Sequence, residues 1–151
     1  MRPETNPAAL QSARQVPVAS WVAQMVGTIA LAFVAYYYVR SMGAPFGGVD
    51  PDWKRYTAGA ALLGIVPALL YLRIFKDALN ADEAAVRARG VPDPVIRPIF
   101  LRALAIGGAL CEIPMAMGVL HLLFGGEMRW FAGATAITIG LRVSYRPFTR
   151  G

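Results

Sequence analysis

The chain has 151 residues, of which 56% are hydrophobic and 16% charged, with a net charge of +6. Soluble domains carry about 25% charged residues, so this composition excludes an ordinary soluble domain and favours an integral membrane protein. The aromatic residues gather near the ends of the apolar blocks and do not alternate with basic ones, so the positive charge does not indicate nucleic-acid binding. We expect the lipid bilayer to be the main partner of the chain.

Four apolar blocks follow one another along the chain. A helix crosses the hydrocarbon core with about 20 apolar residues, and roughly 17 to 25 are tolerated. We therefore predict an all-α fold of four transmembrane helices, packed as two antiparallel hairpins in a single domain, residues 16–147. The spans are expected at about residues 16–39, 56–75, 99–124 and 130–145.

The first span, residues 16–39, follows a polar tail over residues 1–15. The span is longer than the roughly 7 to 15 apolar residues of a signal peptide, and no A-x-A site follows it directly, so we expect an anchor that stays in the membrane. The next segment, "SMGAPFGGVDPDWKR", is rich in Gly and Pro and should turn.

The loop between the second and third spans, residues 76–98, begins "KDALNADEAAVRARG". Its alanines and mixed charges favour a helical extension of the second span that ends at Gly90. Asp82 and Glu83 should lie on the surface of this extension and form solvated ion pairs, such as Glu83 with Arg87. The prolines of "VPDPVIRP" then predict an extended connector.

The basic residues predict the orientation in the membrane. Eleven fall on one side of the predicted topology (Arg2, Arg14, Arg73, Lys76, Arg87, Arg89, Arg97, Arg102, Arg142, Arg146, Arg150) and four on the other (Arg40, Lys54, Arg55, Arg129). The positive-inside rule then places both termini, including the tail 148–151, in the cytoplasm, and the protein in an inner (plasma) membrane. Arg97, Arg102 and Arg142 are interpreted as anchors that reach the lipid headgroups.

A short repeat and a short connection mark the loops on the opposite side. Phe-Gly-Gly occurs at residues 46–48 and 124–126, each time between two spans and followed by an acid, a Trp and a base. This echo fits a duplicated helical hairpin, although the simpler explanation, that Gly-Gly is common in turns, is favoured. The last connection, "GGEMR", is so short that the third and fourth spans should be antiparallel neighbours.

One carboxylate, Glu112, lies inside the third apolar block. Helical spacing places it on a face of small residues, the composition that lets helices approach closely in a membrane. We expect this packing surface to include Ala105, Gly108, Ala109 and Ala116, and to meet a matching surface of Ala60, Gly64 and Ala68 on the second span. Pro114 should kink the helix and free the Leu110 carbonyl, which beside the carboxyl group could bind a proton, a water or a small cation.

Two interpretations of Glu112 follow, and the residues leave both open. No Lys or Arg is expected at its depth, so desolvation should raise its pKa and leave it protonated. In the functional interpretation, Glu112 binds and releases a proton or a small cation, because intramembrane carboxylates are functional candidates by default. In the structural interpretation, it is a protonated packing residue, bonded to a backbone carbonyl or to a neighbour such as Gln24 or Thr138.

The segment "RPIFLRALAIGGALCEIPMAMGVLHLLF", residues 97–124, resembles the carboxylate-bearing helix of the proteolipid c subunits of rotary ATP synthases. The matching features are Arg97-Pro98, then Gly108-Ala109-Leu110, then Glu112. The resemblance implies that Glu112 carries the ion and that the second span is its partner helix. The partner helix lacks the family's alternating glycines and the chain adds two spans, so the likeness is local. The chain as a whole resembles small four-helix membrane proteins of bacteria.

The remaining candidates for chemistry are single residues. His121 is the only histidine. As a haem or chlorophyll ligand it would lack a second axial partner, and we expect it to be solvated by headgroups at the outer interface. Cys111 is the only cysteine and should pack as a small residue, without a disulfide or a metal site. With no P-loop and no G-x-S-x-G elbow, the sequence predicts neither an enzyme nor a cofactor.

The leading hypothesis is a non-enzymatic membrane subunit that handles a proton or a small cation through Glu112, associated with itself or with other membrane subunits. The alternative is a structural or assembly subunit of a larger membrane complex, in which Glu112 only ties helices together.

Overall fold

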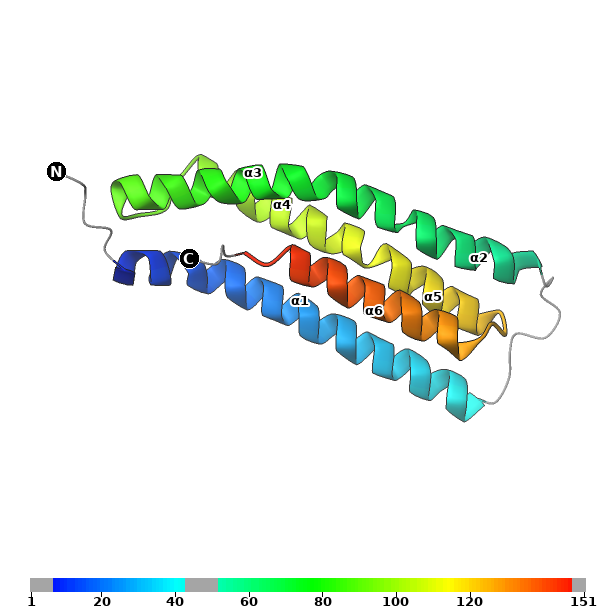
Figure 1. Cartoon of the computed structure of the whole chain (residues 1–151). Helices are drawn as coiled ribbons and strands as arrows, with labels where there is room; N and C mark the ends of the chain where they lie inside the picture. Colours follow the sequence, from blue (N-terminus) through cyan, green and yellow to red (C-terminus); the bar gives the residue numbers. More distant parts are fainter. Residues whose placement is uncertain (1–6, 43–51, 148–151) are drawn as a thin grey trace.

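The structure is a computed structural model that describes residues 7–42 and 52–147. The described residues form six helices joined by short turns (Figure 1). These are α1 (Pro7–Met42), α2 (Asp52–Leu63), α3 (Ile65–Arg89), α4 (Ile96–Cys111), α5 (Ile113–Leu123) and α6 (Met128–Ser144). The prediction of an all-α fold is confirmed. Because α1 already begins at Pro7, residues 7–15 of the predicted polar tail are helical.

The six helices make four rods, because α2 continues into α3 and α4 into α5 with only one residue between them (Figure 1). Three helical stretches are long and apolar enough to cross a membrane, namely Gln11–Ser41, Asp52–Arg89 and Ile96–Leu123. Helix α6 has 17 residues, which corresponds to about 25 Å of length. The helices therefore indicate a membrane-embedded protein, and the fourth span stays a prediction.

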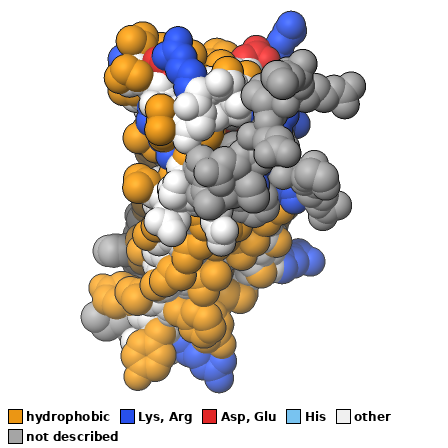
Figure 2. Space-filling view, turned by 90° about the vertical axis from the view of Figure 1, so that its left-hand side faces the viewer, with side chains coloured by type: hydrophobic (Ala, Val, Ile, Leu, Met, Phe, Trp, Pro, Cys, Tyr) orange, Lys and Arg blue, Asp and Glu red, His pale blue; other side chains and the backbone are white. Residues whose placement is uncertain are grey.

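The rods alternate in direction, so α1 begins and α6 ends at the same end of the bundle (Figure 1). Viewed from that end, basic side chains lie along the upper edge and one side, and hydrophobic side chains cover much of the lower part (Figure 2). The closest packing joins α3 to α4, α2 to α5 and α5 to α6. The third and fourth rods are thus neighbours, as predicted. The first and second rods do not form a tight hairpin, because α1 contacts every other rod only sparsely.

The connection between α3 and α4 begins at the glycine that the sequence singled out. Gly90 follows α3 with a φ of 75°, a left-handed conformation suited to glycine, and its N–H donates to the Val86 carbonyl at 2.8 Å. Asp93 then begins the next rod, because its Oδ1 accepts the N–H groups of Val95 and Ile96 at 2.8 and 3.2 Å. These two bonds lower the pKa of Asp93 from its ordinary value. The predicted helical extension, which ends at Gly90, is confirmed. The extended connector predicted over residues 91–98 is shorter than expected, because Val95 already has helical dihedral angles and α4 begins at Ile96.

The second Phe-Gly-Gly, residues 124–126, forms the turn between α5 and α6. Gly125 has a φ of 75°, and the N–H of Gly126 donates to the His121 carbonyl at 2.8 Å. The turn therefore requires glycine for a local reason. The first Phe-Gly-Gly, residues 46–48, lies outside the described residues, so the duplication stays a hypothesis.

Both long rods break where a proline follows. Pro114 cannot donate an N–H and its ring crowds the preceding turn, so α4 ends at Cys111 and α5 begins at Ile113. Pro67 has the same effect on the other rod, which breaks at Gly64. The two breaks face each other, since a Cβ on Gly64 would lie 2.6 Å from Cγ2 of Ile113. The predicted kink at Pro114 is confirmed, and it places Glu112 at the break.

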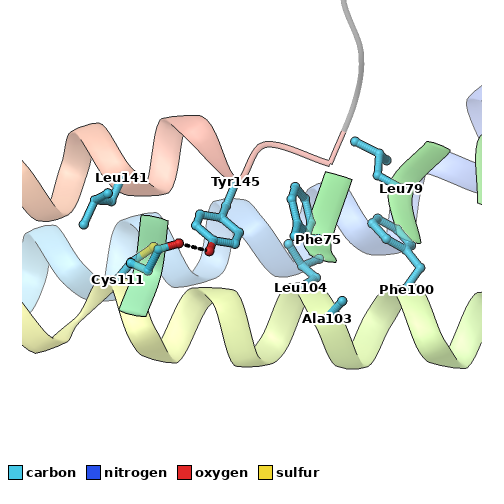
Figure 3. Packing of buried hydrophobic residues seen from close by; sticks show 9 residues of the cluster. Phe75, Leu79, Phe100, Ala103, Leu104, Cys111, Leu141 and Tyr145 are labelled. Atoms are coloured by element: carbon cyan, nitrogen blue, oxygen red, sulfur yellow. Dashed lines mark hydrogen bonds between the residues drawn. The ribbon is translucent and has the colours of Figure 1, made fainter. Parts of the chain in front are cut away.

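An aromatic core fills the half of the bundle nearer the start of α1 (Figure 3). The Tyr145 ring lies 4.9 Å from that of Phe75, which in turn lies 6.0 Å from that of Phe100, each measured between centroids. The Tyr145 hydroxyl donates to the Ala68 carbonyl (dashed line in Figure 3). Gly107 makes room for the tyrosine, because a Cβ there would lie 2.2 Å from Cε1 of the ring. This core holds the second, third and fourth rods together.

The close approach at Gly107 can be tested by adding one methyl group. Gly107→Ala should lower the free energy of unfolding by about 1 to 3 kcal/mol, because the methyl group overlaps the Tyr145 ring. Gly133→Ala is the matched control, since no atom lies within 4 Å of its Cβ position. It should be neutral or stabilise the helix by up to about 1 kcal/mol. Thermal unfolding in detergent measures both, and equal midpoints would contradict this packing.

Candidate functional site

The Arg142 side chain lies in the interior of the bundle, at 5% exposure. Its Nε donates to Thr28 Oγ1 at 2.7 Å and to Glu112 Oε1 at 2.8 Å, and its Nη2 forms an ion pair with the same Glu112 oxygen. Its Nη1 donates to Gln24 Oε1 at 2.7 Å. One guanidinium therefore joins α1, α6 and the break between α4 and α5. These four residues, Gln24, Thr28, Glu112 and Arg142, are called the Arg142 network below.

The Arg142 network corrects two predictions. A basic residue does lie at the depth of Glu112, and Arg142 points into the bundle instead of reaching lipid headgroups. Arg142 thereby gives Glu112 an ion-pair partner within its own chain. The positions of the two residues within their predicted spans could have indicated this pairing. Glu112 is 12 residues from the outer end of the predicted third span (124 − 112), and Arg142 is 12 residues from the outer end of the fourth (142 − 130).

Helix α1 reaches the network because α4 carries a glycine at the crossing point. A Cβ on Gly108 would lie 2.3 Å from Gln24 Oε1 and 3.4 Å from Arg142 Nη1. A second contact sets the register of α1, since Trp21 Nε1 donates to the Arg142 carbonyl at 2.8 Å. Gly108 was predicted as a helix-packing residue, and here it admits a polar side chain instead of another backbone.

Glu112 is held through one oxygen. Its Oε1 accepts from Arg142 and lies 2.5 Å from the Thr28 hydroxyl, whereas no hydrogen bond from the described residues reaches Oε2. The glutamate side chain is 30% exposed. Of the two neighbours considered, Gln24 bonds Arg142 instead of Glu112, and the Thr138 hydroxyl has no partner among the described residues. The carboxylate is thus fixed on one side and reachable on the other.

The predicted ion-binding group around Glu112 is only partly assembled. Pro114 is buried next to the break, and the Glu112 N–H donates to the Ala109 carbonyl at 3.1 Å and also faces the Leu110 carbonyl. A carbonyl oxygen has two lone pairs, so this contact does not exclude a cation there. The role of Leu110 in ion binding stays a prediction.

The predicted packing residues divide into two groups. Gly64, Ala68 and Gly108 are buried and Ala60 is half-buried, whereas Ala105, Ala109 and Ala116 are exposed. On the third rod, formed by α4 and α5, only the Gly108 side of the small-residue face packs against the rest of the chain. The other side is left open to the membrane or to another subunit.

A second polar cluster lies at the end where α1 begins. Arg97 pairs with Asp82 at 2.6 Å and donates to the Ala13 carbonyl. The prediction that Arg97 reaches the lipid headgroups was therefore wrong. Glu83 accepts from Arg87 at 3.1 Å, as predicted, and from Arg14 at 3.2 Å. Both acids are buried and not solvated, because the polar start of α1 covers them. Arg102 is exposed, and its role as a lipid anchor stays a prediction.

His121 is buried at the opposite end, at 5% exposure. Its Nδ1 lies 3.0 Å from the Lys54 carbonyl and 3.1 Å from Thr57 Oγ1, and its Nε2 accepts the Glu127 N–H at 3.2 Å. The expectation of a headgroup-solvated histidine was wrong, because Gly126 lets the turn fold over the ring. Both ring nitrogens are engaged in holding α2 and the α5–α6 turn. In the part of the chain that the structure describes, no group of three His, Cys, Asp or Glu side chains could hold a metal ion.

Comparison of the chain with models of protein families, with curated proteins and with solved structures finds no match. The resemblance of residues 97–124 to the proteolipid c subunits therefore stays a prediction.

The coupling of Glu112 to Arg142 can be measured by a double-mutant cycle. Glu112→Gln should lower the free energy of unfolding by about 3 to 5 kcal/mol, because it leaves the buried Arg142 charge unpaired. Arg142→Gln should lower it by less, because the Glu112 side chain that it leaves unpaired is 30% exposed. The double variant should lose clearly less free energy of unfolding than the two single variants lose together, since neither charge remains. The control is Arg102→Gln, an exposed site that should change stability by less than about 0.5 kcal/mol. Additive effects of the two substitutions would contradict the pairing.

Proposed function

We propose that the protein is a non-enzymatic integral membrane protein that crosses the bilayer four times with both termini in the cytoplasm, and that it serves as a structural or assembly subunit of a larger membrane complex. The observation that carries this proposal is the ion pair between Glu112 and Arg142. The pair gives the carboxylate a partner within its own chain, so its presence in the membrane does not require an external ion.

The same ion pair supports the proposal of a fourth span. Arg142 on α6 meets Glu112 in the middle of Ile96–Leu123, a stretch that is itself apolar and long enough to cross a membrane. A helix that contacts the middle of a membrane-spanning rod and runs antiparallel to it shares its depth. The positive-inside rule supports the orientation, because the end where α1 begins carries the Arg14, Arg87, Arg89 and Arg97 side chains.

The uncovered small residues support association with another subunit. Ala105, Ala109 and Ala116 are exposed on the third rod, and small residues are what lets helices approach closely in a bilayer. Within the chain, their counterparts Gly64 and Gly108 are already occupied by contacts with Ile113 and Gln24. The remaining face is suited to a helix from a second copy or from a different subunit.

This association can be tested by enlarging the small residues. Ala109→Leu and Ala116→Leu should release the co-purifying subunit, or reduce the oligomer to a monomer, when the full chain is isolated from membranes in mild detergent. Ala30→Leu is the matched control, because Ala30 is equally exposed but lies on α1. Size-exclusion chromatography with light scattering gives the assembly mass. A wild-type chain that is always monomeric and free of other polypeptides would overturn the assembly role.

A second candidate function is proton handling by Glu112, and one observation favours it. The glutamate side chain is 30% exposed, and its Oε2 receives no hydrogen bond from the described residues. A proton can therefore reach the carboxyl group without unfolding of the bundle. A metal cation is disfavoured at the same place, because it would lie beside the positive guanidinium of Arg142.

Carbodiimide labelling distinguishes the two functions, because the reagent modifies protonated carboxyl groups. In native membranes at neutral pH, a structural Glu112 paired with Arg142 should stay unlabelled, and Arg142→Gln should make it reactive. Proton handling predicts labelling of the wild-type residue that increases as the pH falls from 8 to 5. Glu112→Gln is the control for the site of labelling, with peptide mapping by mass spectrometry as the readout. Protection by an added cation would contradict the argument against cation binding.

A further inference from the structure

A groove of about 460 Å³ lies between α1 and α6 and opens to the side of the bundle. Ala32, Phe33 and Tyr36 line it from α1, and Phe131, Ala136 and Ile139 line it from α6. The lining is almost wholly apolar, and its volume falls within the roughly 300 to 1,000 Å³ of small-molecule sites. None of these residues belongs to the Arg142 network.

The longer wall of the groove, on α6, matches one leaflet of a bilayer. It runs from Met128 to Ile139, and 11 steps along a helix correspond to about 17 Å, whereas the wall on α1 runs only from Ala32 to Tyr36. Half of a hydrocarbon core of about 30 Å is about 15 Å. The groove begins at the first residue of α6 and stops short of Arg142. There Trp21 donates to the Arg142 carbonyl and Arg142 donates to Gln24 Oε1, and these two bonds hold α1 against α6. A ligand that fills it extends from the membrane surface to mid-depth.

A cation stands at the outer mouth of the groove. Arg40 lies one helical turn beyond Tyr36, and its Nη1 donates to the Tyr36 hydroxyl at 2.6 Å. The guanidinium carbon lies 5.9 Å from the centre of the tyrosine ring. Arg40 is exposed, and within residues 7–42 and 52–147 no carboxylate forms an ion pair with it. A groove-lining residue thus holds a basic side chain at the depth where lipid phosphates lie.

We propose that this groove binds an anionic phospholipid, with one acyl chain between α1 and α6 and the phosphate at Arg40. A guanidinium can donate two parallel hydrogen bonds to a phosphate, which suits it to this headgroup. A transmembrane helix from a partner protein is a poorer occupant, because it needs a face along the whole rod and this groove covers only half of it. The proposal requires membrane embedding but does not depend on the role of Glu112.

The test compares two lipids that differ only in headgroup charge. The full chain is purified in mild detergent and titrated with phosphatidylglycerol or phosphatidylcholine of identical acyl chains, and bound lipid is counted by native mass spectrometry. The wild type should bind phosphatidylglycerol about fivefold more tightly, the ratio expected for one basic residue near an anionic lipid. Arg40→Gln should bring this ratio close to 1 without abolishing binding. Arg55→Gln, which removes an exposed basic residue at the same end, should leave the ratio unchanged.

The groove itself is tested by filling it. Ala136→Phe should weaken the binding of both lipids severalfold, and Ala132→Phe makes the same test if the first variant does not fold, because Ala132 lines the same groove and is exposed. Gly133→Phe is the matched control on α6, since Gly133 does not line the groove and has open space around it. Equal affinity of the wild type for both lipids, or unchanged binding after filling, would overturn the proposal. So would a co-purified polypeptide that Ala136→Phe releases in place of lipid.

Discussion

A buried guanidinium imposes the main constraint on this bundle. An ionised side chain at membrane depth is costly unless it is paired and hydrogen-bonded, so Arg142 must be surrounded by acceptors. The acceptors are Glu112 at the break in the third rod and Gln24 and Thr28 on α1. Because these acceptors come from two separate segments and Arg142 from a third, the position of one charge fixes the relative register of α1, α6 and the third rod. Gly108 is part of the same constraint, since a larger residue there would exclude Gln24.

The first helix shows how weakly apolar contacts specify register in a bilayer. Lipid tails are as apolar as leucine side chains, so burying an apolar helix face against another helix gains little. The apolar stretch of α1 is only 6% buried, and most of the contacts that place it are polar. Arg97 and Glu83 bind its start, and the Arg142 network and Trp21 bind its middle. Apolar packing adds to these ties at Ala13 and Pro17 near its start and in a small cluster around Ala35 and Met115 towards its end.

Most of the fold could be predicted from hydropathy and from single Gly or Pro residues that end or break a helix. Gly90 and Pro114 mark the helix end and the break where the structure has them, because each acts through its own backbone. The candidate site was predictable only in part, because its geometry depends on which way α6 is rotated. That helix is apolar on most sides, so its pattern gives no inward face, and Arg142 was interpreted as an anchor. Counting residues from the outer ends of the third and fourth predicted spans would have placed Arg142 at the level of Glu112.

The buried acids at the other polar cluster were missed for a different reason. Asp82 and Glu83 have the spacing of a solvated helix face, and only the folded start of α1 removes them from water. The small-residue face of the third rod posed a similar difficulty. Helical spacing identifies Ala105 and Gly108 as one surface but does not reveal which edge a neighbouring rod covers.

The two helix breaks have a mechanical consequence. Gly64 and Ile113 touch, so the second and third rods are interrupted at one depth, between an aromatic core on one side and the Met115–Phe131 cluster on the other. A continuous helix resists bending because its backbone hydrogen bonds run along its whole length. A helix interrupted by proline bends more easily where a hydrogen bond is missing. The bundle can therefore bend at one level, where both rods are interrupted. Glu112 lies at that level, so a tilt of either half changes its distance from Arg142.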